Sequence, residues 1–262
     1  MSGVDFSPRV ALASLSGAAD AAWARAASEY AGCAFLGGLS LDGPTREAAR
    51  ALVARDRDEF LPEDPVAFVD AQLTAADDLP MTLGVNVRTT TLAPLRDVAR
   101  VCDDHDALLE VNAHCRQDEM CAAGAGETLL RDTDQLCEQV AAASEAGATV
   151  SVKVRAEVEG VDLPALARRL DDAGASVLHV DAMDSEWTVS DIVEAFDGFV
   201  VANNGVRDRA TVREYLAHGA DAVSVGRPSD DPRVLSRVRE AADDWFAERA
   251  DGENEGGPRA TR

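Results

Sequence analysis

Lysine is almost absent from this chain of 262 residues. Only one of its 25 basic side chains is a lysine, Lys153, and the others are arginines. That lysine lies in the apolar run Ala148-Thr-Val-Ser-Val-Lys-Val-Arg155, a pattern typical of a buried strand. The planar fork of arginine cannot replace a compact, mobile ammonium, so one interpretation is that the function requires an ammonium at this position. The alternative is that the lysine persists there by chance.

Other missing features exclude whole classes of protein. No apolar run approaches the roughly 20 residues that a membrane span needs, and no secretory signal opens the chain. The five cysteines are odd in number and form no CxxC pair. We therefore expect a cytoplasmic protein with reduced thiols and no membrane contact. We expect no metal, since the spacing of His114, Cys115 and Cys121 matches no common zinc pattern.

Acidic residues are in large excess, 48 against 25 basic ones, for a formal net charge of -23. The acids are spread along the chain and not gathered in one tail. With so little lysine, this pattern indicates a halophilic protein in molar salt, where screening over about 3 Å makes self-repulsion tolerable. An acidic surface dedicated to a basic partner would instead predict clustered acids.

Short β-like runs alternate with amphipathic helical stretches, as in βα units on a parallel sheet. Strands are expected at 9–14, 33–38, 82–87, 107–112, 149–155, 176–182, 198–202 and 221–226. Helices are expected to fill the gaps between them, for instance at 18–30, 92–102, 128–146, 163–173, 209–218 and 232–247. Eight such units over this length predict an α/β fold, a single-domain (β/α)8 TIM barrel of about 250 residues, with a doubly wound sheet as the alternative.

Unusual residues fall at the expected carboxyl ends of the strands, where barrels carry their chemistry. Asn203-Asn204-Gly205 and Gly226-Arg227 stand at adjacent strand ends, each leading into a helix, which indicates a phosphate site. Ordinary turn chemistry is the alternative for these loops. Cys115, three residues after Asn112, lies in a polar loop as a candidate acid or nucleophile.

With these residues assembled, the chain resembles the FMN-dependent tRNA-dihydrouridine synthases and their archaeal relatives, from Ala11 to about Leu235. The segment Val111-Asn-Ala-His-Cys115 with Gly124-Ala-Gly-Glu-Thr-Leu-Leu-Arg-Asp132 is similar to the family's Asn-x-Gly-Cys-Pro segment and the Gly-x-Gly-x-x-Leu-Leu that follows it. Val152-Lys-Val-Arg155 resembles the family's Val-Lys-x-Arg strand. The chain departs from the family at His114 and Arg116, which flank the cysteine, and at Asp181, which stands where a histidine is usual.

The resemblance implies that residues 1–250 form an FMN-binding barrel. Residues 251–262 are polar, glycine-containing and aperiodic, so we expect a disordered polar tail there. It implies reduction of the C5–C6 double bond of a pyrimidine, most simply uridine in tRNA, with NADPH as reductant. Cys115 would donate a proton to C5, and Lys153 would stabilise the reduced flavin. The residues expected to bind the cofactor are Ser14, Asn86, Asn112, Lys153, Asp181, Asn203, Asn204, Gly205, Gly226 and Arg227.

Two rival functions remain open from the sequence. A small-molecule flavoenzyme resembling dihydroorotate dehydrogenase would share the cysteine and the lysine, although that family usually has a second lysine. A flavin-free phosphate-sugar aldolase or epimerase would use Lys153 for a Schiff base or a phosphate contact. The chain also ends with the barrel, without the helical domain with which the usual synthases grip tRNA, so a separate tRNA-binding partner is a further expectation.

Overall fold

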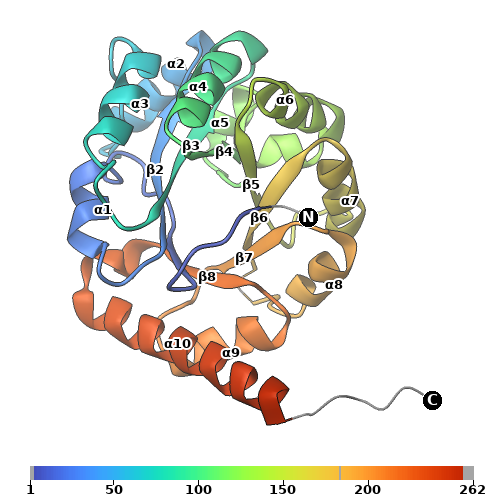
Figure 1. Cartoon of the computed structure of the whole chain (residues 1–262). Coiled ribbons are helices and arrows are strands. Elements are labelled where there is room, and N and C mark those ends of the chain that lie inside the picture. The colour runs from blue at the N-terminus through green and yellow to red at the C-terminus, as the bar shows by residue number, and fades with distance from the viewer. Residues whose placement is uncertain (1–2, 183, 256–262) are drawn as a thin grey trace.

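Eight parallel strands close into a barrel, and helices surround it (Figure 1). The computed structural model describes residues 3–182 and 184–255. Each strand pairs with its neighbours in sequence and β1 pairs with β8, so the predicted (β/α)8 barrel is confirmed. The strands are β1 (Val10–Leu12), β2 (Cys33–Ser40), β3 (Thr82–Arg88), β4 (Leu108–Asn112), β5 (Thr149–Arg155), β6 (Ala175–Asp181), β7 (Phe199–Asn203) and β8 (Ala222–Val225).

The outer helices begin at capping carboxylates in most cases, as at Asp20, Asp42, Asp64, Asp162 and Asp208. The α-helices are α1 (Ala21–Ala27), α2 (Gly43–Val53), α3 (Pro65–Thr74), α4 (Leu92–Asp104), α5 (Asp118–Ala122), α6 (Thr133–Glu145), α7 (Leu163–Asp172), α8 (Thr188–Ala195), α9 (Arg209–Ala217) and α10 (Pro232–Glu255). Two short 3₁₀ helices are η1 (Gly126–Leu130) and η2 (Arg227–Asp230).

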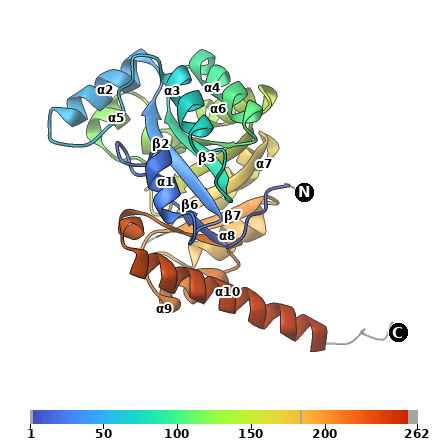
Figure 2. The same cartoon turned by 60° about the vertical axis from the view of Figure 1, so that its left-hand side comes forward.

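Two expectations about helices were wrong. The helix expected at 128–146 is divided into η1 and α6, because Asp132 accepts a hydrogen bond from the backbone of Gln135 and starts a new helix there. Helix α10 continues to Glu255, past position 251, where the polar tail was expected to begin (Figure 2). A single glycine, Gly252, costs only about 1 kcal/mol in a helix and does not stop it. Residues 256–262 of the expected tail lie outside the described residues.

The barrel interior has an apolar layer where the strands begin and a polar layer nearer their carboxyl ends. Apolar side chains, among them Phe6, Phe35, Leu108 and Phe199, fill the end where the strands begin. Gly84 makes room there, because a Cβ on it would lie 2.6 Å from the ring of Phe35. Polar side chains occupy the interior positions nearer the carboxyl ends. A second, larger core packs the outer face of the strands against the helices.

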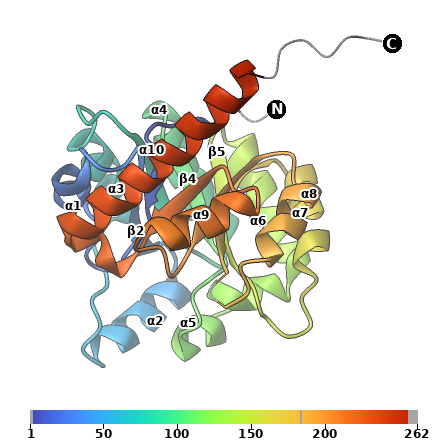
Figure 3. The same ribbon diagram turned by 90° about the horizontal axis from the view of Figure 1, so that it is seen from below.

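Helices α2 and α5 form a rim at the carboxyl ends, because they follow β2 and β4 directly. They lie side by side and project from the barrel (Figure 3). Arg55 and Glu119 join them across 3.0 Å, and a small apolar cluster that includes Leu52 and Met120 packs beneath them. Within the described part of the chain, no helix has both the length and the apolar character required to cross a bilayer.

Candidate active site at the carboxyl ends of the strands

A chain of hydrogen-bonded polar side chains crosses the barrel interior. Asn112 at the end of β4 donates to Asn86 Oδ1 over 2.9 Å, and Asn86 donates to Glu110 Oε1 over 2.7 Å. The other oxygen of Glu110 lies 2.7 Å from His179 Nδ1. Asn86, Glu110 and His179 are fully buried. Asn86 and Asn112, which were expected to contact the cofactor, are therefore hydrogen-bonded to each other. Each amide nitrogen still has one further hydrogen to donate.

The chain continues from His179 to the other side of the barrel. His179 Nε2 lies 2.7 Å from Ser224 Oγ, which lies 2.9 Å from Asn203 Oδ1. Burial and the charge of Lys153 hold the pKa of His179 below its ordinary value. Burial raises the pKa of Glu110, but His179, Lys153 and Asn86 outweigh it and hold that pKa below its ordinary value. Glu110 is therefore a buried carboxylate at neutral pH.

Lys153 lies in the same interior row of β5, in register with Asn112 and His179. Its side chain is 4% exposed, and among the described residues Nζ has no hydrogen-bond partner. Burial lowers the pKa of Lys153, while the charges of Glu110 and Asp181 raise it. A buried polar group normally has a hydrogen-bond partner. This ammonium is therefore suited to bind a carbonyl or an anion of a ligand at the barrel mouth, the opening at the carboxyl ends of the strands.

Cys115 lies in a loop that is fixed from both sides. Asn112 Oδ1 accepts hydrogen bonds from the backbone N–H of His114 and of Cys115, at 3.2 and 2.9 Å. The carbonyl of Cys115 accepts from the N–H of Glu127 at 2.9 Å. Gly126 has a φ of +64°, and a Cβ on it would lie 2.2 Å from that carbonyl oxygen, so only glycine fits. The half-buried thiol also packs against the cluster under α2 and α5.

Asp181 connects three loops of the mouth. Its Oδ2 lies 2.5 Å from His114 Nε2, and its Oδ1 accepts from Asn204 Nδ2 at 2.8 Å. Arg155 lies 3.9 Å away. Burial alone would raise the pKa of Asp181, but the hydrogen bonds from His114 and Asn204 and the charge of Arg155 hold it well below its ordinary range. The sequence placed Asp181 here but did not show that His114 would meet it.

The two expected phosphate loops are adjacent, with Asn203 at the end of β7 and Gly226 just after β8. Asn204 and Gly205 have positive φ values of 85° and 70°. A Cβ added to Gly205 or to Gly226 would meet nothing within 4 Å, so a ligand can approach both backbones closely. Arg227 is exposed beside them.

The loops do not lead into helices as expected. Helix α9 starts only at Arg209, and the carboxylate of Asp208 already caps the N–H of Thr211. Gly226 precedes a short 3₁₀ helix. A phosphate here would therefore contact loop backbone and arginine, since the α9 terminus already has a carboxylate. Ser14, the remaining expected residue, lies two positions beyond β1 at the same end and is half-buried.

Arg88 was missed by the sequence reasoning. It ends β3 two residues after Asn86, so it points to the same side of the strand. Its Nη2 donates to Glu59 Oε2 at 2.7 Å and to Ser16 Oγ at 2.8 Å. Glu59 belongs to the segment between α2 and α3, which therefore covers one side of the mouth. The two-residue period of β3 could have identified Arg88, but nothing in the sequence pairs it with Glu59.

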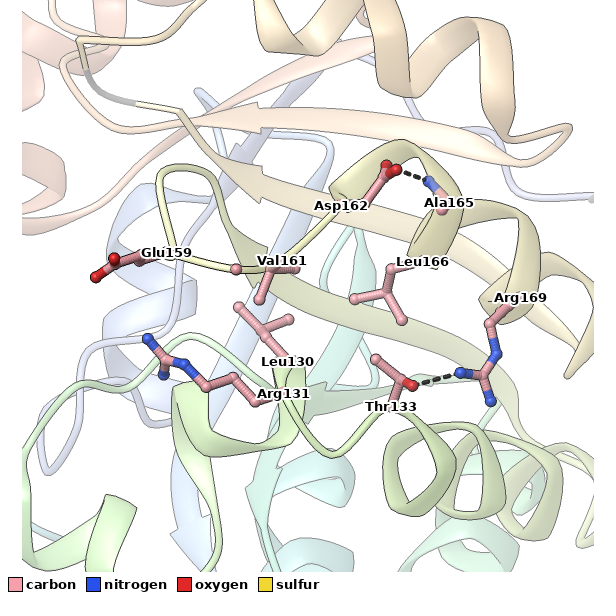
Figure 4. A pocket seen from close by; sticks show the side chains of 10 residues that line it. Leu130, Arg131, Thr133, Glu159, Val161, Asp162, Ala165, Leu166 and Arg169 are labelled. Atoms are coloured by element: carbon pink, nitrogen blue, oxygen red, sulfur yellow. Dashed lines mark hydrogen bonds between the residues drawn. The ribbon is translucent and has the colours of Figure 1, made fainter.

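A cavity lies elsewhere, outside the barrel (Figure 4). It has a volume of about 380 Å³ and lies between η1, the start of α6 and the start of α7. Its arginines include Arg169, which bonds to Thr133 and Asp134. Its lining contains no residue expected to bind cofactor or donate a proton, so we place the candidate site at the mouth and not here. Among the described residues, no group of three or more His, Cys, Asp or Glu side chains could hold a metal ion.

Two curated relatives and one solved structure put this geometry in context. An uncharacterized protein of Methanocaldococcus jannaschii is 27% identical over 232 residues, which cover 84% of this chain and 88% of that protein. The tRNA-dihydrouridine synthase B of Xanthomonas axonopodis pv. citri is 29% identical over 162 residues, covering 56% of this chain and 49% of that protein. DHODH from Eimeria tenella, in complex with ferulenol, superposes with a TM-score of 0.67 at 15% identity, covering 95% of this chain and 84% of that one.

The structural likeness shows the fold, which agrees with the closed barrel. The family model for dihydrouridine synthase (Dus) matches residues 69–252, which include β3 to β8 and the Cys115 loop. This match covers well over half of the chain, and the protein is a member of the dihydrouridine synthase family.

Proposed function

We propose that this protein is an FMN-dependent oxidoreductase that reduces the C5–C6 double bond of a pyrimidine, most simply uridine in tRNA, with NADPH as reductant. The observation that carries the proposal is the chain's single lysine. Lys153 is buried without a hydrogen-bond partner among the described residues, at the strand end beside the loop that carries Cys115. This arrangement, in a member of the dihydrouridine synthase family, supports a redox site for a ring with carbonyl groups.

The residues of the mouth fit FMN. Lys153 would donate to the pyrimidine edge of the flavin ring, and the spare amide hydrogens of Asn86 and Asn112 lie beside it. The open backbones of Gly205 and Gly226, with Arg227, would receive the phosphate, with Asn203 and Asn204 shaping that loop. Ser14 and Asp181 would complete the contacts. FMN, when bound, supplies the hydride for the reduction.

Cys115 would give the proton that the carbon next to the hydride acceptor requires. A thiol is a suitable donor because its S–H can be passed to a neighbouring carbon. The backbone hydrogen bonds to Asn112 and Glu127 hold the thiol in place before substrate arrives. Lys153 would stabilise negative charge on the ring; burial lowers its pKa, and the charges of Glu110 and Asp181 oppose that shift.

The nature of the substrate is the finer part of the proposal. The family match supports uridine in tRNA, and the chain spans about half the length of the Xanthomonas synthase that it matches. A small pyrimidine as substrate is the second candidate, favoured by the DHODH-like barrel. In molar salt basic patches contribute little to RNA affinity, so the acidic composition does not decide between the two.

Two measurements test the proposal. Purified protein should be yellow and release FMN on denaturation; colourless protein that cannot be reconstituted would remove the flavin and favour a phosphate-sugar enzyme. Mass spectrometry of tRNA nucleosides from a deletion strain should then show loss of dihydrouridine, restored by the wild-type protein and by Cys137→Ala but not by Cys115→Ala. Dihydrouridine that stays unchanged on deletion, in a strain without a second synthase, would favour a small pyrimidine.

A further inference from the structure

His114 presents a fixed hydrogen-bond acceptor at the mouth of the barrel. Its Nε2 lies 2.5 Å from Asp181 Oδ2, so a proton on Nε2 is donated to that carboxylate. In the neutral ring the other nitrogen, Nδ1, then carries a lone pair and no proton. Among the described residues Nδ1 has no hydrogen-bond partner, and the side chain is 28% exposed.

The protonation state follows from the surroundings. Burial and the charges of Lys153 and Arg155 lower the pKa of His114, although Asp181 opposes them. Asp181 itself stays ionised, because its pKa is held well below the ordinary range. Asp181 is fixed in turn by Asn204, so both the tautomer and the orientation of the His114 ring are set before any ligand binds.

Several other acceptors at this end of the barrel are already occupied. Asn112 Oδ1 takes two backbone N–H groups, Asn86 Oδ1 takes Asn112, and the carboxylate of Glu59 takes Arg88. Free donors remain, above all Lys153. A ring in which one N–H lies between two carbonyl groups matches this set, because its oxygens accept from donors and its N–H needs one acceptor.

We propose that His114, positioned by Asp181, accepts a hydrogen bond from the imide N–H of a pyrimidine-2,4-dione ring. This inference rests on the proposed function, in which such a ring occurs twice: in the uracil substrate and in the flavin. His114 touches the ligand, and Asp181 acts through His114. The contact favours uracil over cytosine, whose N3 is an acceptor and would face the lone pair of Nδ1.

Two substitutions separate the two nitrogens of His114. His114→Gln keeps a donor near the position of Nε2 for Asp181 and removes the acceptor at Nδ1. His114→Asn keeps an acceptor near Nδ1 and loses the reach to Asp181. The matched control is His105→Gln, because His105 also pairs with an aspartate, Asp70 at 2.8 Å, on the outer helices.

The probes are FMN, UMP and N3-methyl-UMP, which lacks the imide N–H. Dissociation constants come from quenching of flavin fluorescence and from the flavin absorbance change as each nucleotide is added. If the substrate is the donor, His114→Gln weakens UMP binding about tenfold and leaves N3-methyl-UMP and FMN binding within twofold. If the flavin is the donor, FMN binding weakens about tenfold instead. His114→Asn retains more affinity than His114→Gln in either case, and His105→Gln matches wild type.

The inference is overturned if His114→Gln changes neither dissociation constant by more than twofold. It is also overturned if UMP and N3-methyl-UMP weaken equally while FMN binding is unchanged, since the imide N–H would then play no part. Wild-type protein that binds neither FMN nor UMP overturns the proposed function and this inference with it. The inference alone is overturned if both variants bind FMN as wild type does and still prefer UMP to N3-methyl-UMP as wild type does. The proposed function would then stand.

Discussion

A buried ion pair between Arg88 and Glu59 holds the segment between α2 and α3 over the barrel mouth, and Glu59→Gln tests this role. The two side chains are 1% and 2% exposed and lie 2.7 Å apart. Nη2 of Arg88 also donates to Ser16 and to the carbonyl of Gly38, whereas Nε and Nη1 are buried and have no partner among the described residues. Removing the charge of Glu59 leaves a buried guanidinium with neutral acceptors alone.

The expected loss is large because the charge stays buried. Breaking a buried pair by removing one partner costs about 3–5 kcal/mol, out of a total stability of roughly 5–15 kcal/mol for a typical domain. For a chain of this size the same loss lowers Tm by roughly 10 °C. The segment between α2 and α3 can also detach locally, which would limit the global loss. Arg55 and Arg57, exposed in that segment, would then become sites of tryptic cleavage.

The assay is urea unfolding of wild type and Glu59→Gln, combined with limited trypsin digestion. Asp243→Asn is the matched control, because its partner Arg239 lies 3.3 Å away on the surface and such pairs contribute about 0–1 kcal/mol. A free energy of unfolding within 0.5 kcal/mol of wild type, together with unchanged cleavage after Arg55 and Arg57, would refute the reasoning.

Two further predictions concern the Cys115 loop and the lysine. Gly126→Ala should leave the circular dichroism unchanged but lower the rate of pyrimidine reduction about 100-fold, because the new Cβ displaces the Cys115 loop. Gly160→Ala is the control, since Gly160 has a similar φ of +80° but open space around it, and its rate should stay near that of wild type. Equal losses in the two variants would contradict this reason. Glu110→Gln should move the alkaline limb of the pH–rate profile to lower pH, because the Glu110 charge raises the pKa of Lys153; a limb that stays or moves upward would show that Lys153 does not set it.

The barrel was predictable because its strands are short apolar runs that alternate with helical stretches and are bounded by turn residues. Lys153, Asn112 and Asn203 lie where the strand pattern placed them, in interior positions near the carboxyl ends. The division of one expected helix at Asp132 was missed, since a capping aspartate inside an amphipathic stretch has no distinct period. Helices were expected in the gaps between strands, but the packing of α2 against α5 was not, because no period in the sequence relates two helices that follow different strands.

Contacts between distant residues were beyond the sequence. His114 and Asp181 are 67 positions apart, and no sequence motif joins them. Only the closed barrel brings them together. The partner of Arg88 was hidden for the same reason, since Glu59 lies in an irregular segment that no periodicity describes.

The polar chain from Asn112 to Asn203 has a consequence for how this protein can change over time. Each side chain in it is hydrogen-bonded to the next. Replacing one of them alone leaves a buried neighbour without a partner, which lowers the stability of the fold by about 1–3 kcal/mol. Replacing both partners of a bond together avoids most of that loss. Evolution at these positions is therefore expected to proceed by paired exchanges, and an alignment of close relatives should show them covarying as one set.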